Sequence, residues 1–395
     1  MRSERETNLI IDIGSGSVAT AVVSISTDIN LAPQILYISR KEIKYYGGLN
    51  SRRFLFSMIT ALEGSLSDIQ KDFISKGKNI KINNIHCFFS SLWHISQMRV
   101  LKSESIKEIK ITKSIINKMI EDGEKNFELC QTKDNKTDFS KNDIQIIEKK
   151  IMQIKLNGYE TADPYHKIAK TIEMDFFISS VSKNIIKIFE DSLFRFFNDT
   201  KIYYHTFVNS VFTTLRDLNS SIDDYIFLDI SGEITEVAIV KNGVLFDSVS
   251  FPLGKNTMVR KLSETLETNK EEALSRISLY KSDNLVEFSK SKISKAIDDT
   301  MRDWHQLLDL SIKKLLSNIA LPQVVFFMSD DDIKTLIGDF IKLYKFDDID
   351  TFGKLVEIKF IENEVFDKHI VYQDNISRDQ FLSLETVFLN KIKNL

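Results

Sequence analysis

The sequence predicts an α/β protein built from two lobes. Two segments share one pattern: an apolar run rich in β-branched residues ends at an aspartate, a turn of small residues follows, and a second apolar run begins. They are residues 9–18 (LIIDIGSGSV) and 225–240 (YIFLDISGEITEVAIV). The pattern is typical of a β-hairpin. Its turn offers backbone N–H groups and hydroxyls to an anion, and its aspartate can hold a hydrated cation. Two such turns predict two facing lobes that bind a polyphosphate.

The composition is that of an ordinary globular protein and excludes several function classes. Of 395 residues, 43% are hydrophobic and 28% charged, and the formal net charge of -3 gives no global field for nucleic acid. The two cysteines, Cys87 and Cys130, form neither a disulfide framework nor a zinc spacing. We find no secretory signal and no apolar run long enough to span a membrane. We therefore expect a cytoplasmic protein with no nucleic-acid partner.

The first half of the chain predicts one lobe with a compact insert. Hydrophobic periodicity indicates strands within 8–25 and 34–44 and a helix over 54–76. We assign residues 1–82 and 184–221 to the first lobe and residues 83–183 to an inserted α+β subdomain. Within the insert we expect strands at 85–92, 95–101, 144–156 and 171–181, a helix at 112–127 and a loop at 132–142.

The second half predicts another lobe of the same kind. We assign residues 222–378 to it, with a helical subdomain at about 257–321, and residues 379–395 to a C-terminal amphipathic helix. Pro322 ends the long helix predicted at 292–319, because proline cannot continue a helix. After it we expect strands at 324–328 and 355–360 and a helix at 332–344.

With both hairpins placed, the chain resembles the actin/Hsp70/sugar-kinase superfamily, and within it the bacterial FtsA and PilM group. The resemblance covers nearly the whole chain and rests on the order and spacing of its motifs. These motifs are residues 12–16 (DIGSG), 155–159 (KLNGY), 229–236 (DISGEITE), 251–258 (FPLGKNTM) and 270–273 (KEEA). The resemblance implies a two-lobed actin-like fold, in which a ribonuclease H-like unit is duplicated, with an SHS2-like inserted subdomain.

The resemblance also implies a site for ATP and Mg²⁺. The two hairpin turns would be the phosphate-1 and phosphate-2 loops, with Asp12 and Asp229 holding Mg²⁺ through water. The alternative is an ordinary hairpin turn, which prefers the same residues. No residue can be named as a catalytic base, since residues 204–210 carry no carboxylate and His205 is expected to be a structural or surface histidine. The implied cofactor-binding residues are Asp12, Gly14, Ser15, Gly16, Ser17, Asp229, Ser231, Gly232 and Thr235.

Three departures from the family's pattern affect this chemistry. No lysine follows the first turn, where residues 17–20 are Ser, Val, Ala and Thr. Glu233 stands at a phosphate-2 glycine, and a carboxylate beside a polyphosphate is repelled unless it points away or meets a cation. Residues 328–332 (MSDDD) replace the Gly-Gly turn that approaches adenosine. The departures indicate a degenerate or weak nucleotide site, and ATP binding rather than efficient hydrolysis.

The C-terminal segment allows two interpretations. Its apolar face includes Phe381, Leu384, Phe388 and Ile392. FtsA proteins typically end in an amphipathic helix that lies in the membrane interface, so this face could make peripheral contact with the inner face of the cell membrane. The alternative is a terminal helix docked on the second lobe, which Glu385 within the stripe favours.

The leading functional hypothesis is an FtsA-like scaffold of bacterial cell division. Such a protein would self-associate and link an FtsZ-like, tubulin-related polymer to the membrane. The first alternative is a PilM-like component of type IV pilus assembly, whose insert clasps a peptide from an inner-membrane pilus protein. The second is an active ATPase or kinase of the same fold, which would need a base carboxylate and an intact adenosine turn.

Overall fold

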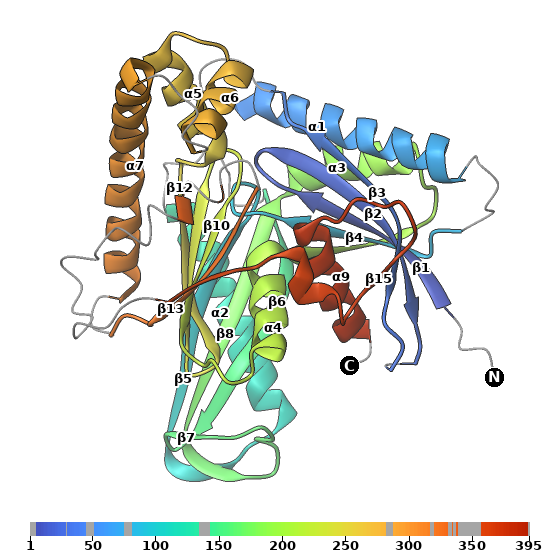
Figure 1. Cartoon of the computed structure of the whole chain (residues 1–395). Coiled ribbons are helices and arrows are strands. Elements are labelled where there is room, and N and C mark those ends of the chain that lie inside the picture. The colour runs from blue at the N-terminus through green and yellow to red at the C-terminus, as the bar shows by residue number, and fades with distance from the viewer. Residues whose placement is uncertain are drawn as a thin grey trace.

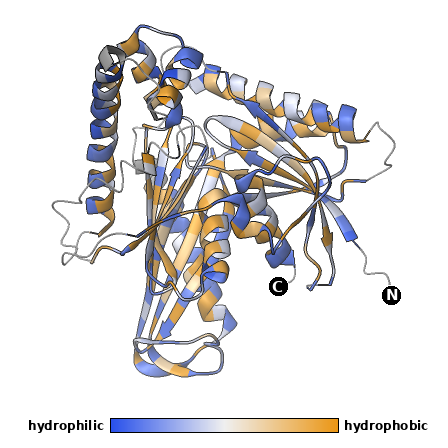
Figure 2. Cartoon of the chain, viewed as in Figure 1, coloured by the Kyte–Doolittle hydropathy of each residue, from blue (hydrophilic) through white to orange (hydrophobic). Residues whose placement is uncertain are grey.

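The computed structural model shows two α/β lobes side by side and an elongated subdomain that projects away from their junction (Figure 1). It describes residues 5–28, 30–44, 51–74, 81–133, 143–281, 287–316, 320–330, 334, 337–338 and 357–393. Most of the helix predicted at 332–344 and most of the loop predicted at 132–142 fall outside these residues. Figure 2 shows hydrophobic residues along the strands of the sheets and a mixture of polar and apolar residues on the outer helices.

The first lobe is built on a six-stranded sheet with the order β15-β3-β2-β1-β4-β9. β1 pairs antiparallel with β2 and parallel with β4, and β4 pairs parallel with β9. The strands are β1 (Arg5–Ile13), β2 (Ser17–Ser26), β3 (Gln34–Glu42), β4 (Asn84–Phe89), β9 (Lys201–Thr206) and β15 (Val371–Tyr372). β4 therefore belongs to this sheet and not to the insert, which begins after Phe89 rather than at residue 83.

The second lobe repeats this arrangement. Its five-stranded sheet has the order β12-β11-β10-β13-β14, which matches β3-β2-β1-β4-β9 strand for strand and direction for direction. The strands are β10 (Tyr225–Ile230), β11 (Thr235–Lys241), β12 (Val244–Phe251), β13 (Val324–Ser329) and β14 (Glu357–Phe360). The duplicated fold predicted from the two hairpins is thus present. It places Asp12 and Asp229 at equivalent positions near the ends of the two central strands.

Helices cover the outer faces of both sheets. On the first lobe lie α1 (Ser51–Asp68), its π-helical continuation η1 (Ile69–Ile74) and α3 (Lys183–Phe194). On the second lie α5 (Lys255–Leu266), α6 (Lys270–Lys281) and α7 (Glu287–Leu316). A short 3₁₀ helix, η2 (Asn363–Phe366), follows β14. The apolar side chains of α5, α6 and α7 share one buried cluster with β10, β11 and β13, including the fully buried Trp304. This burial explains the periodicity that predicted the helical subdomain.

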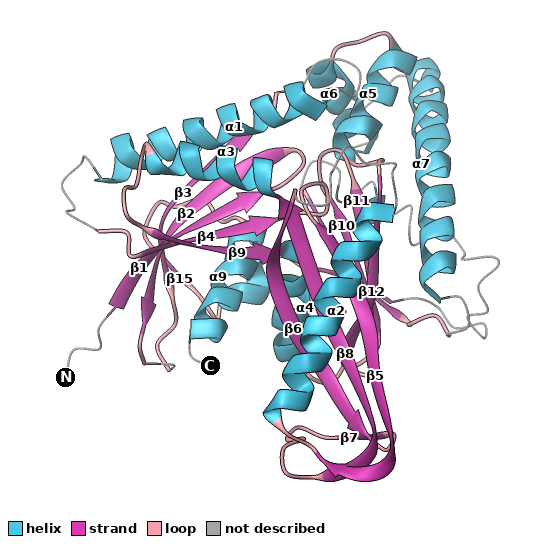
Figure 3. Cartoon of the chain, turned by 180° about the vertical axis from the view of Figure 1, so that it is seen from behind, coloured by secondary structure: helices cyan, strands magenta, loops and turns pink. Residues whose placement is uncertain are grey.

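The inserted subdomain is a four-stranded antiparallel sheet with the order β5-β8-β6-β7 and one long helix, α2, packed on one face (Figure 3). Its elements are β5 (Ile95–Lys110), α2 (Lys113–Lys133), β6 (Ile144–Leu156), β7 (Tyr159–Glu160) and β8 (Ile168–Ser182). β5 continues nine residues beyond the predicted end at Leu101. Residues 102–104 and 109–110 pair with β8 on either side of an irregularity, although most side chains of 102–110 are polar and exposed. Apolar periodicity is weak in such a stretch.

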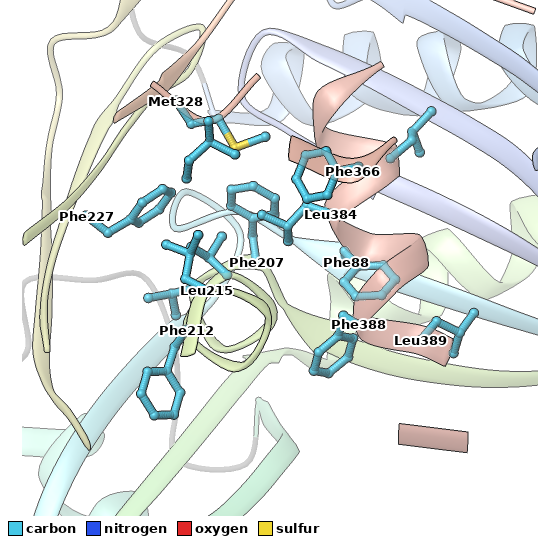
Figure 4. Close-up of a cluster of buried hydrophobic side chains, with 14 of the residues drawn as sticks. Phe88, Phe207, Phe212, Leu215, Phe227, Met328, Phe366, Leu384, Phe388 and Leu389 are labelled. Carbon is cyan, nitrogen blue, oxygen red and sulfur yellow. The ribbon is translucent and has the colours of Figure 1, made fainter. Parts of the chain in front are cut away.

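Two helices fill the junction between the lobes. α4 (Phe207–Leu218) follows β9, and α9 (Gln380–Lys393) ends the described chain. Their apolar side chains meet residues of both sheets in one buried cluster (Figure 4). Residues of the insert also belong to this cluster. Phe88 of the first sheet meets Phe388 edge to face, with ring centroids 5.7 Å apart. α9 therefore lies beside α4 in the junction and against β1 and β2 of the first sheet.

The C-terminal segment is docked on the protein, but it lies in the junction against α4, β1 and β2 and not on the second lobe as the docked interpretation expected. Leu384 is fully buried and Phe388 is 2% exposed, while Phe381 and Ile392 pack against the same cluster. The four side chains expected at a membrane thus contact protein here. No helix in the described part of the chain is long and apolar enough to cross a membrane.

Candidate functional site

The two predicted turns meet at the cleft between the lobes. Each is closed by the same backbone hydrogen bond: Gly14 N–H donates to Ser17 O at 3.0 Å, and Ser231 N–H donates to Ile234 O at 3.1 Å. The hairpin register puts Asp12 opposite Ala19 in one lobe and Asp229 opposite Glu236 in the other. The duplicated sheets therefore place two equivalent turns face to face.

The turns touch each other directly. The Ser15 and Ser231 hydroxyl oxygens are 2.9 Å apart, and the Glu233 N–H donates to Ser15 Oγ at 2.9 Å. A Cβ added to Gly232 would lie 2.2 Å from the Gly16 Cα, closer than any real Cβ contact. Backbone therefore packs on backbone at the position where a nucleotide's phosphates would separate the loops.

Arg40 of β3 occupies the centre of this cleft, and no feature of the sequence singled it out. Its guanidinium donates to Asp12 Oδ2 at 3.1 Å, to Ser17 Oγ at 2.6 Å and to both carboxylate oxygens of Asp379 at 2.7 and 2.9 Å. The guanidinium carbon also lies 5.3 Å from the centre of the Phe381 ring. Burial opposes the charge of Arg40, but Asp379 and Asp12 outweigh it and raise the pKa.

The cavity that remains is small. It has a volume of about 30 Å³, whereas pockets for small ligands occupy roughly 300–1,000 Å³. Of the predicted site residues, seven line it: Asp12, Gly14, Gly16, Ser17, Asp229, Ser231 and Gly232. A nucleotide can therefore enter only if the lobes separate and the contacts of Arg40 and Ser15 break.

Burial raises the pKa of three carboxyl groups in or beside the cleft. Burial raises the pKa of Asp12 to about 6 against the pull of Arg40, and it raises the pKa of Glu236 to about 7. Burial and then the neighbouring Glu236 hold the pKa of Asp229 well above its usual range. Asp229 Oδ1 has no hydrogen-bond partner among the described residues. These shifts follow from desolvation, which penalises a charged carboxylate.

The donor set does not fit Mg²⁺ in this arrangement. Magnesium requires ionised or strongly polar oxygen ligands and keeps several waters. Asp12 is already paired with Arg40, and burial, which raises the pKa of Asp229 well above its usual range, disfavours the ionised form that would bind a cation. Within the described residues, no group of three or more His, Cys, Asp or Glu side chains is placed to hold a metal ion. The positive charge of the cleft comes from the chain itself.

Glu233 does not face the cleft. Its carboxylate accepts two hydrogen bonds from Arg260, at 2.9 and 2.6 Å, and others from Asn256 and Thr257. Arg260 of α5 therefore neutralises the Glu233 carboxylate, which the sequence analysis expected to repel a polyphosphate. The sequence does contain Arg260, in the helix that follows the second hairpin. Its ion pair with Glu233 could not be predicted, because it depends on the close approach of Gly254 to Ser231.

Thr235, which the sequence placed among the cofactor-binding residues, lies away from the cavity. Its hydroxyl donates to Leu253 O at 2.7 Å and accepts from Trp304 Nε1 at 2.9 Å, inside the core of the second lobe. Thr235 is fully buried and does not line the cavity. It begins β11, so the side chain points into the lobe instead of across the turn.

The segment that replaces the adenosine turn is bound to other parts of the chain. Lys255 Nζ contacts Asp330 Oδ2 at 2.9 Å, and Gln380 Nε2 donates to Ser329 O at 2.6 Å. Residues 331 and 332 of this segment lie outside the described residues. The end of β13 is thus tied to α5 and to the start of α9, a second departure from a nucleotide-binding cleft.

The duplicated sheets, the junction helices and the facing turns define an actin-like protein with an inserted subdomain. No protein-family model and no curated protein matches the chain. Among solved structures, it is similar to a chain of the PilM-PilN type IV pilus biogenesis complex, with 11% identity, 98% of each chain covered and a TM-score of 0.62.

Two further structures cover nearly all of the chain at lower scores. One is MreB 5 of Spiroplasma citri bound to AMPPNP, with 9% identity, 99% and 98% coverage and a TM-score of 0.46. The other is a Bacteroides thetaiotaomicron protein of actin-like ATPase fold and unknown function, with 9% identity, 97% and 96% coverage and a TM-score of 0.42. The predicted two-lobed fold is confirmed by this whole-chain similarity to a chain of the PilM-PilN complex.

Proposed function

We propose that the protein is a cytoplasmic actin-like scaffold whose cleft is held shut by its own side chains. The observation that carries this proposal is Arg40, which joins Asp12, Ser17 and Asp379 in the space between the lobes. Buried charges are retained where they are paired. A guanidinium that already pairs with the Asp12 and Asp379 carboxylates leaves little for a bound Mg²⁺–polyphosphate to contribute. Such a protein acts through its surfaces rather than through turnover.

We further propose that the scaffold binds a cytoplasmic segment of an inner-membrane protein, as a PilM-like component of pilus assembly. Whole-chain similarity to a chain of the PilM-PilN complex supports this choice. The FtsA-like role in cell division, with an FtsZ-like partner, self-association and peripheral membrane contact, is the second candidate. Its argument from an amphipathic tail loses weight, because α9 fills the junction between the lobes.

Calorimetry with ATP and Mg²⁺ tests the closed cleft. We expect no binding heat with the wild-type protein at millimolar ATP, while a known actin-like ATPase measured alongside shows that the assay detects binding. Binding in the micromolar range would overturn the proposal and restore the nucleotide-binding, or even the ATPase, hypothesis.

Titration with fluorescent peptides tests the partner. One peptide would be a cytoplasmic segment of a PilN-type protein, and the other a segment of an FtsZ-type protein. Saturable binding of the first alone supports the pilus role. Binding of the second alone would replace it with the division role.

A further inference from the structure

The inserted subdomain is attached to the junction helix α4. Met98, Met152 and Phe177 of its sheet belong to the same buried cluster as Phe212 and Leu215 of α4. This face of the sheet is the one opposite α2. The insert is therefore joined to the helix that packs between the two lobes, and not only to the lobe from which its chain emerges.

Glu148 of β6 caps the N-terminus of α4. Its carboxylate accepts the backbone N–H of Thr206 at 2.9 Å, the Thr206 hydroxyl at 2.5 Å and the side-chain amide of Asn209 at 2.9 Å. Thr206 is the N-cap residue, yet its own side chain makes no capping hydrogen bond to α4. A helix N-terminus carries unpaired N–H groups and a partial positive charge, which a carboxylate stabilises. Here another subdomain supplies that carboxylate.

The interaction keeps Glu148 ionised although it is buried. Burial opposes the charge, but His205, Thr206 and Asn209 outweigh this effect and hold the pKa of Glu148 below its usual range. Lys150, two residues along the same face of β6, donates to the Thr213 hydroxyl at 3.0 Å. Glu148 and Lys150 of the insert therefore both form hydrogen bonds with the first turns of α4.

The residue after the cap reaches the cleft. Phe207 lines the same cavity as Arg40, and its ring centroid lies 5.7 Å from that of Phe381. The Phe381 ring in turn lies against the Arg40 guanidinium. A short series of direct contacts therefore links Glu148 of the insert to the ion pairs that hold the cleft shut.

We propose that Glu148 couples the position of the inserted subdomain to closure of the cleft. The inference rests on the proposed function, since it takes the closed cleft as the state that Arg40 maintains. A partner that moves the insert would weaken the cap, shift Phe207 and loosen the contact between the two turns. Because coupling between two sites is reciprocal, opening of the cleft would change the affinity of the insert for that partner by the same factor.

Hydrogen exchange of the full-length protein, without nucleotide, tests this coupling. In Glu148→Ala we expect the amides of residues 206–210 to exchange faster by about tenfold or more, since a charged hydrogen-bond acceptor is lost from a buried site. We expect the same direction of change at the turns 14–17 and 231–234. Glu148→Gln keeps the volume and one acceptor oxygen, so it should fold readily and show a smaller change at the same three places.

Lys149→Ala is the matched control. Lys149 lies on the opposite face of β6 and pairs with Glu124 of α2 at 2.8 Å, so its loss should leave all three segments unchanged. Faster exchange confined to 206–210 in both Glu148 variants, with unchanged turns, would overturn the coupling and leave only a helix cap. Because no nucleotide is present, this result is independent of the calorimetric test of the proposed function.

Discussion

Gly16 and Gly232 pack backbone to backbone across the cleft. A Cβ on Gly16 would lie 2.8 Å from the Gly232 Cα, and a Cβ on Gly232 would lie 2.2 Å from the Gly16 Cα. The adjoining serines, Ser15 and Ser231, share a hydrogen bond of 2.9 Å. Small residues that predict phosphate loops therefore serve here as the surface on which one lobe closes against the other.

Gly232→Ala is expected to destabilise the closed protein by about 1–3 kcal/mol, the usual range for overpacking. The added methyl group would press on the backbone of Ser15 and Gly16, which cannot move aside as a flexible side chain can. Urea denaturation measures the change. Gly64→Ala in α1 is the control, since the added Cβ would meet its nearest neighbour at 3.6 Å and alanine favours a helix. Equal effects of the two substitutions would contradict the close contact.

Arg40→Gln is expected to lower the free energy of unfolding by about 2–3 kcal/mol. Losing one partner of a buried ion pair costs roughly 3–5 kcal/mol, and the 27% exposure of Arg40 reduces that figure. The control is Lys41→Gln, which breaks a surface pair with Asp68 and should cost less than about 1 kcal/mol. If the two variants unfold at the same urea concentration, Arg40 does not hold the cleft.

Stability should fall with rising pH through Glu236. Its folded pKa is about 7 against an ordinary 4.5, so the unfolded state releases the proton first. The contribution of protonated Glu236 to the free energy of unfolding is fully present below pH 4.5 and is lost as the pH rises to about 7. Between pH 5 and 8, the free energy of unfolding of Glu236→Gln should fall by on the order of 2–3 kcal/mol less than that of the wild type. Parallel stability curves for wild type and variant would show that Glu236 does not titrate in this window.

Glu385→Met is expected to stabilise the protein by about 1–3 kcal/mol. Glu385 is fully buried in α9, neither carboxylate oxygen has a hydrogen-bond partner among the described residues, and burial raises its pKa well above the usual range. Methionine fills a similar volume without a polar group. Thermal denaturation at pH 7 measures the gain, and a lower melting temperature would show that the carboxyl group has a partner in solution.

Truncation after residue 378 should prevent stable folding. It removes Leu382, Leu384 and Phe388 from the cluster between the lobes, and each buried side chain of this size contributes roughly 1.5–3 kcal/mol. Truncation after residue 393 should leave the circular dichroism spectrum unchanged. A folded 1–378 protein, together with liposome flotation of the full chain alone, would favour the membrane interpretation of the tail.

The duplicated fold could be predicted from sequence because its signal is local and periodic. An apolar run ending at Asp12, and another ending at Asp229, each define a buried central strand and a turn, whatever lies around them. The same holds for α7, whose apolar stripe matches one face of a helix. Most lining residues of the cleft follow from these turns.

The state of the cleft could not be predicted, because it depends on pairings between distant residues. Arg40 lies 28 positions from Asp12 and 339 from Asp379, and nothing in its own neighbourhood distinguishes it from other surface arginines. Likewise, Glu148 meets Thr206 only because the insert folds back onto α4.

The sequence by itself therefore determined the two hairpins, the duplication and the class of fold, since hydrophobic periodicity and turn chemistry are properties of neighbouring residues. Only the tertiary structure decided that β4 belongs to the first sheet, that α9 lies in the junction and that Arg40 fills the cleft. These depend on which distant side chains can be buried and paired together, and burial and charge pairing are properties of the folded whole.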